Sequence, residues 1–160
     1  MNKFSIEIKW GIIFTIAALV WMYIEKALGW HDELVSKHAI FTNIFAIVAI
    51  VVYVLALRDK KLNFYNGQMS WTQGFISGVI VSVVVAILAP LAQYVTHEFI
   101  TPNYFENVIA YSIENDMMNQ EGAEAYFSLT SYMMQAAFGA LAMGVVTSAI
   151  VALFVKSKKS

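Results

Sequence analysis

Residues 40–57 read IFTNIFAIVAIVVYVLAL, a stretch of eighteen residues without a charged side chain. As an α-helix it would be about 27 Å long, close to the roughly 30 Å thickness of a bilayer's hydrocarbon core. Lipid offers no water to the backbone N–H and C=O groups, so a segment in lipid must satisfy them internally, as a helix does. The stretch therefore predicts a transmembrane helix.

Three further segments have the same character, at about residues 10–28, 75–95 and 135–155. The chain of 160 residues is 59% hydrophobic and 13% charged, whereas ordinary soluble domains are about 25% charged. The sequence has no ten-residue segments of alternating hydrophobicity, which would indicate a β-barrel. We predict a single membrane domain over residues 1–160, an all-α integral membrane four-helix bundle with the lipid bilayer as its surroundings.

The basic residues gather on one side of this predicted bundle. Eight of the ten Lys and Arg residues flank the N-terminus, the loop at 58–74 or the C-terminal tail: Lys3, Lys9, Arg58, Lys60, Lys61, Lys156, Lys158 and Lys159. The opposite, outer side holds nine of the eleven acidic residues. Since Lys and Arg are enriched on the cytoplasmic side of membranes, we expect both termini in the cytoplasm.

The segment between the third and fourth spans is too long to lack structure, and we expect a helical insert over about 101–132. Thr101 and Pro102 offer an N-cap and a first-turn proline. The apolar spacing that follows predicts an amphipathic helix on the outer membrane surface. A second helix should begin near Asn119 or Gln120 and run on into the fourth span. Aromatic residues of the insert, including Tyr104 and Tyr132, are typical of the membrane interface.

Small residues recur at every fourth position of the third and fourth spans. The members are Gly74, Gly78, Ser82 and Ala86 in one span and Ala140, Gly144 and Ser148 in the other. Each set lies on one helix face, and small residues let helix backbones approach closely in lipid. We predict close packing between these two spans. A homodimer contact through the same residues is the main alternative.

Glu25 is the acidic residue that the predicted spans contain, and an ionisable group in a membrane is a functional candidate. Gln93, Thr42 and Asn43 lie at a similar depth on other spans. Glu25, Gln93 and His97 form a candidate polar or ion site that would line the path of a transporter. Because Glu25 lies about one turn from the outer end of its span, a structural or interfacial role is the alternative.

All three histidines fall on the outer side. His31 and His38, together with Asp32 and Glu98, form a candidate metal or pH-responsive patch, because imidazole and carboxylate are common metal ligands. Their spacing matches no known ligand pattern such as H-E-x-x-H, and the sequence favours ordinary surface residues without a metal. No nucleotide-binding or catalytic motif occurs. We therefore expect no enzyme activity, no cofactor and no nucleic acid partner.

The order of several motifs is similar to that of one known family. These motifs are KWGIIF at 9–14, HAIFTN at 38–43, YVLALR at 53–58, QGFISG at 73–78, FITPNYF at 99–105 and EAYF at 124–127. Together they resemble an uncharacterised bacterial membrane family, domain of unknown function 4199. The resemblance implies a four-span envelope protein, which we expect in the bacterial inner membrane, and it assigns no site residues.

Two functions fit these observations. The first is a non-enzymatic structural or accessory protein that acts through helix packing and outer-loop contacts, with a second copy or another envelope protein as its partner. The second is a small homo-oligomeric ion or solute transporter that uses Glu25 as a proton or cation site.

Overall fold

A computed structural model describes residues 3–157, and all regular structure in this part is helical. The elements are α1 (Ser5–Ala27), α2 (Val35–Phe41), the 3-10 helix η1 (Thr42–Ile44), α3 (Phe45–Asn63), α4 (Trp71–Val95), the π-helix η2 (Thr96–Ile100), α5 (Tyr104–Glu114), α6 (Gln120–Tyr126) and α7 (Leu129–Val155). Four stretches are long and apolar enough to cross a membrane: Ser5–Ala27, Val35–Asn63, Trp71–Ile100 and Leu129–Val155. The predicted all-α fold is confirmed, with four helical stretches that could cross a membrane by length and composition.

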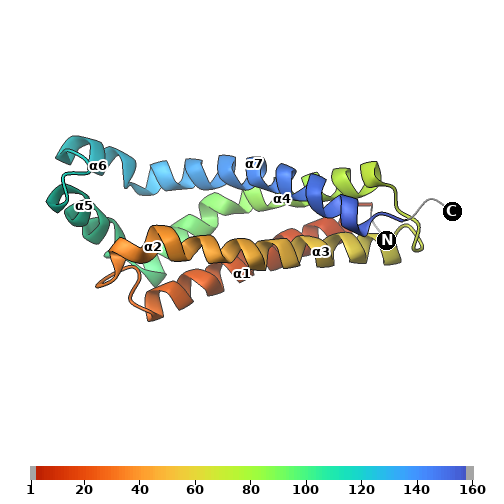
Figure 1. Cartoon of the computed structure of the whole chain (residues 1–160), viewed down its shortest axis with the longest axis horizontal. Helices are drawn as coiled ribbons and strands as arrows, with labels where there is room; N and C mark the ends of the chain where they lie inside the picture. The colour runs from red at the N-terminus through yellow and green to blue at the C-terminus, as the bar shows by residue number, and fades with distance from the viewer. Residues whose placement is uncertain (1–2, 158–160) are drawn as a thin grey trace.

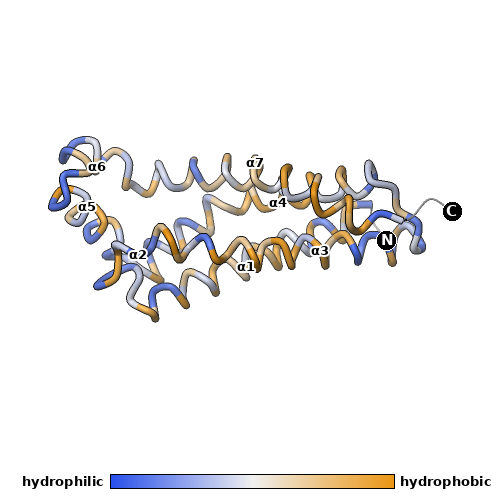
Figure 2. The backbone as a smooth tube through the Cα atoms, in the orientation of Figure 1, coloured by the Kyte–Doolittle hydropathy of each residue, from blue (hydrophilic) through white to orange (hydrophobic). Residues whose placement is uncertain are grey.

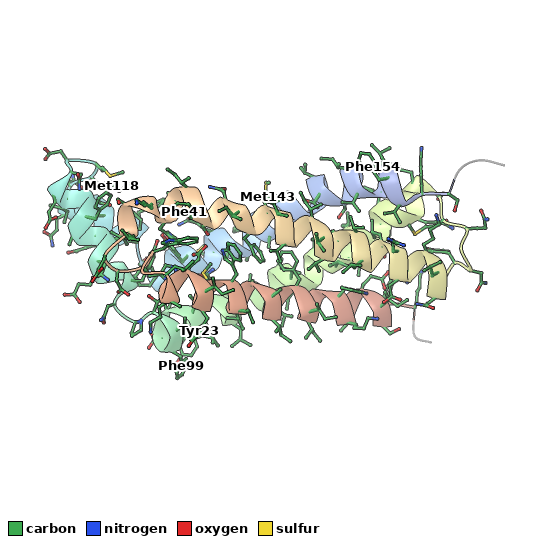
Figure 3. All side chains as sticks on the ribbon, turned by 60° about the horizontal axis from the view of Figure 1, so that its bottom comes forward. Tyr23, Phe41, Phe99, Met118, Met143 and Phe154 are labelled. Carbon is green, nitrogen blue, oxygen red and sulfur yellow. The ribbon has the colours of Figure 1, made fainter. Side chains whose placement is uncertain are left out.

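The four long helices run side by side along the long axis of the molecule (Figure 1). Both ends of the described chain lie at one end of the bundle, which we call the terminal end. α2, α5 and α6 lie at the opposite, distal end. Hydrophilic residues concentrate at these two ends, with apolar residues between them (Figure 2). Large apolar side chains such as Met143 and Phe154 project outward from the bundle (Figure 3), as expected where lipid is the solvent.

The helices extend beyond the predicted apolar segments. The second stretch runs from Val35 to Asn63 because η1 joins α2 to α3, and helical hydrogen bonding continues into residues that hydropathy excludes. The turn after α3 uses Asn66 and Gly67, both with positive φ (50° and 84°). Ser70 and Gln73 then form a capping box at the start of α4, as the sequence indicates.

α4 and α7 meet along their small residues. A Cβ placed on Gly78 would lie 2.6 Å from Cβ of Ser148, and one on Gly144 would lie 2.6 Å from Cβ of Ser82. No side chain larger than hydrogen fits at either glycine without a shift of its neighbours. The adjoining core consists of Tyr53, Ala56, Leu57, Met69, Val81, Val85, Val151, Ala152 and Val155.

Two expectations for the distal segment are wrong in detail. The helix expected to have Thr101 as its N-cap starts at Tyr104, after Asn103, because Thr101 is instead the C-cap of η2, with its N–H bonded to the Thr96 carbonyl (2.8 Å). α6 does begin after Asn119, as expected, but it ends at Tyr126. The Ser128 side chain then caps α7, so α6 and α7 are separate helices. A position of α5 on the membrane surface stays a prediction.

Candidate functional site

Glu25 lies in the last turns of α1 at the distal end, and its side chain is fully buried (0% exposed). Trp21 is one helical turn earlier on the same face, as an i, i+4 pair requires. Its indole Nε1–H donates to Oε1 of Glu25 (2.5 Å). The second carboxylate oxygen, Oε2, is left for other partners.

A glycine turn brings the first of these partners back over α1. Gly29 has φ +75°. Its N–H bonds to the carbonyl of Lys26 (2.9 Å), and the N–H of Trp30 bonds to the carbonyl of Glu25 (3.0 Å). This pair of bonds is a Schellman motif, which reverses the chain after a helix and favours glycine at the left-handed position. As a result His31, 1% exposed, lies with Nε2 at 3.0 Å from Oε2 of Glu25.

His38 of α2 completes the group. Its Nε2 lies 3.1 Å from the same oxygen of Glu25. The three ligand atoms of Glu25, His31 and His38 all lie within 4.8 Å of one another. Two imidazoles that converge on one buried carboxylate oxygen suit a shared proton or a metal ion.

Tyr104, the first residue of α5, is at the centre of the surrounding aromatic groups. Its ring centroid lies 5.2 Å from those of His31 and His38 and 5.3 Å from that of His97. Its hydroxyl oxygen is 3.2 Å from Nδ1 of His38 and 3.1 Å from the Tyr132 hydroxyl. Burial raises the pKa of Tyr104 well above its usual value, so this hydroxyl stays protonated at neutral pH.

A cavity of about 140 Å³ adjoins the group. Its lining consists of Met22, His31, His38, Thr42, Gln93, His97, Tyr104 and Tyr132. His97 belongs to the π-helical turn, and its Nε2 lies 3.1 Å from Oε1 of Gln93. Among the described residues, two buried side-chain nitrogen atoms have no hydrogen-bond partner, Nδ1 of His31 and Nδ1 of His97. Both belong to residues that line this cavity.

The structure regroups the residues that the sequence singled out. Gln93 and His97 share the cavity wall with His31 and His38, whereas Glu25 contacts the two histidines directly.

Two members of the predicted outer patch lie apart from this group. Asp32 accepts a hydrogen bond from Asn107 (3.0 Å), and Glu98 is exposed. Sequence reasoning missed Trp21 and assigned Tyr104 and Tyr132 to the membrane interface. The four-residue spacing of Trp21 and Glu25 is the signal that could have found the first of these.

A second buried polar group lies near the terminal end. Glu7, 1% exposed, pairs with Nζ of Lys60, 3% exposed, at 2.9 Å. Ser77 donates to the same carboxylate (2.8 Å). The expectation that Glu25 is the acidic residue within the spans was incomplete, because α1 begins at Ser5 and includes Glu7.

Comparison with known proteins gives one match. The sequence pattern of a family described as "Protein of unknown function (DUF4199)" matches residues 9–157. No curated protein and no solved structure matches the chain.

Proposed function

This chain belongs to the DUF4199 family, and we propose that it is a membrane protein that binds one divalent transition-metal ion of the Zn²⁺ class. The ligands are Oε2 of Glu25 and the Nε2 atoms of His31 and His38. The observation that carries this proposal is the convergence of these three atoms within 4.8 Å in a buried place. Side chains from α1, the following turn and α2 supply them.

The donor set fits such an ion in type and spacing. Zn²⁺ binds imidazole nitrogen and carboxylate oxygen at about 2.0–2.2 Å, so tetrahedral ligands are separated by about 3.4 Å. The two oxygen–nitrogen separations here are 3.0 and 3.1 Å, and small side-chain adjustments would admit the ion. Ca²⁺ and Mg²⁺ prefer sites built from oxygen atoms alone.

The neighbouring residues support the same use. Imidazole that ligates a metal through Nε2 carries its proton on Nδ1, and a partner for that proton fixes the ring. Nδ1–H of His38 can donate a hydrogen bond to the hydroxyl oxygen of Tyr104, and the Tyr104 hydroxyl can donate one to that of Tyr132. Trp21 in turn holds Oε1 of Glu25 and leaves Oε2 for the ion.

The sequence suggests an accessory protein or a transporter with a cation site at Glu25. The convergence of His31 and His38 on Glu25 supports a cation site there. We favour binding over transport because the packed core around Leu57 and Val81 separates this site from the terminal end. The ion would join α1 to α2, so we propose a non-enzymatic accessory role for the distal end. A second copy or another envelope protein remains the proposed partner.

We also propose the bacterial inner membrane as the location, with the terminal end in the cytoplasm. The excess of Lys and Arg in the flanks of that end supports this orientation. Lys158 and Lys159, two of these flanking residues, lie outside the described residues.

The test is metal content of the full-length protein in detergent micelles. The protein is stripped with a chelator, exposed to Zn²⁺, passed through a desalting column and measured by mass spectrometry of the metal. We expect about one ion per wild-type chain. Uptake should be lost in Glu25→Gln and in the double variant His31→Gln/His38→Gln. Glu98→Gln, at an exposed position, is the matched control and should bind like wild type.

A conservative variant guards against loss of fold. Tyr104→Phe keeps all three ligands and removes the partner of His38, so Zn²⁺ affinity should fall about 10- to 100-fold. Circular dichroism and size-exclusion chromatography monitor the fold of every variant. Absence of uptake by the wild type, or wild-type uptake by the double histidine variant, would refute the proposal.

A further inference from the structure

The proposed metal centre has three protein ligands, whereas a tetrahedral ion takes four. In residues 3–157, the clustered His, Asp and Glu ligand atoms come from Glu25, His31 and His38. Structural zinc sites are closed by a fourth side chain, while open sites keep that position for water or another small molecule. The nature of the centre therefore depends on what lies beside these three residues.

The cavity described above lies beside them. His31 and His38 belong both to the ligand group and to the cavity wall. Its volume of about 140 Å³ is about ten times the roughly 10–15 Å³ that one water molecule needs by a comparable measure. A fourth ligand of a few atoms therefore has room next to the ion.

The net charge of the proposed metal centre indicates the charge of its fourth ligand. A divalent ion, the Glu25 carboxylate and two neutral imidazoles sum to one positive charge. A net charge in a buried place is unfavourable unless it is compensated. We infer that the fourth ligand of the ion is a small monoanion, such as hydroxide or a short oxyanion, held in the cavity between His31, His38 and His97. This inference rests on the proposed function.

The experiment uses Co²⁺ in place of Zn²⁺, because the visible absorption of Co²⁺ changes when a ligand is exchanged. Azide, a three-atom monoanion, is titrated into the Co²⁺-loaded full-length protein in micelles. We expect a saturable change of the spectrum. Thr42→Leu adds volume at the cavity wall and should weaken azide binding about tenfold or more while Co²⁺ uptake persists. Thr130→Leu, at an exposed position, should bind azide like wild type.

The outcomes separate the two proposals. Failure of the wild type to take up Co²⁺ would overturn the metal centre itself and the inference with it. Uptake of Co²⁺ with a spectrum that azide leaves unchanged would overturn only the inference, because the fourth position would then be closed. An azide response of equal strength in Thr42→Leu would place the anion outside this cavity and would also overturn the inference.

Discussion

Replacement of Lys60 by Met tests the buried ion pair near the terminal end. In Lys60→Met the Glu7 carboxylate stays buried and keeps the Ser77 hydroxyl as its donor (2.8 Å). Removal of one partner from a buried ion pair lowers the free energy of unfolding by about 3–5 kcal/mol. Each 1.4 kcal/mol changes an equilibrium constant about tenfold, so the folded-to-unfolded ratio should fall by two orders of magnitude or more.

The reverse replacement, Glu7→Gln, should have a smaller effect, about 2 kcal/mol. The Lys60 ammonium keeps the carbonyl oxygen of Lys3 at 2.6 Å and the face of the Phe64 ring at 3.7 Å. The amide oxygen of Gln can still accept from Ser77. The double variant Glu7→Gln/Lys60→Met removes both charges of this pair. Its decrease in the free energy of unfolding should therefore be at least about 2 kcal/mol smaller than the sum of the decreases in the two single variants.

Equilibrium unfolding in detergent micelles, followed by tryptophan fluorescence, measures these free energies. Lys61→Met is the matched control, since Lys61 donates to the carbonyl oxygen of Val155 (2.9 Å) instead of to a carboxylate. Lys61→Met should lower the free energy of unfolding by about 1 kcal/mol, the value of one hydrogen bond. Additive losses in the double variant, or equal losses in Lys60→Met and Lys61→Met, would refute this account of the pair.

Two further predictions concern the helices. Gly144→Ala places a methyl group 2.6 Å from Cβ of Ser82 and from Oη of Tyr53 and should lower the free energy of unfolding by about 1–3 kcal/mol. Gly139→Ala, with nothing within 4 Å of its new Cβ, should leave it unchanged or raise it by up to about 1 kcal/mol, because Ala favours a helix interior over Gly. Similar losses at both glycines in the same assay would contradict close packing at Gly144. Ser70→Ala removes the capping box of α4 and should lower the free energy of unfolding by about 1 kcal/mol, and an unchanged value would show that the cap contributes nothing.

The four long apolar helices could be predicted because hydropathy is a local property that each segment carries by itself. The contact of α4 with α7 was also accessible, since Gly78 and Gly144 each belong to a four-residue repeat on their own helix. The start of α1 could not be predicted, because Glu7 and Lys9 interrupt the apolar pattern although helical hydrogen bonding continues through them. Hydropathy therefore placed Glu7 outside the span.

The candidate site was only partly predictable. The sequence singled out Glu25, His31 and His38, but assigned Glu25 to one group and the histidines to another. The contact of Glu25 with His31 and His38 depends on the turn at Gly29, which reverses the chain after α1. Residue spacing does not predict this change in the direction of the chain. Tyr104 was placed at the membrane interface because aromatic residues are enriched there, whereas its burial depends on α2, which is remote in sequence.

The Schellman turn at Gly29 has a consequence for the order of folding. It places all three proposed ligands within residues 25–38, so their contacts close only short loops, and local contacts form early. The far wall of the cavity, with Gln93, His97 and Tyr132, comes from helices synthesised much later. A nascent chain could therefore assemble the ligand group once the first hairpin is made, and would enclose it only after the last helix has inserted.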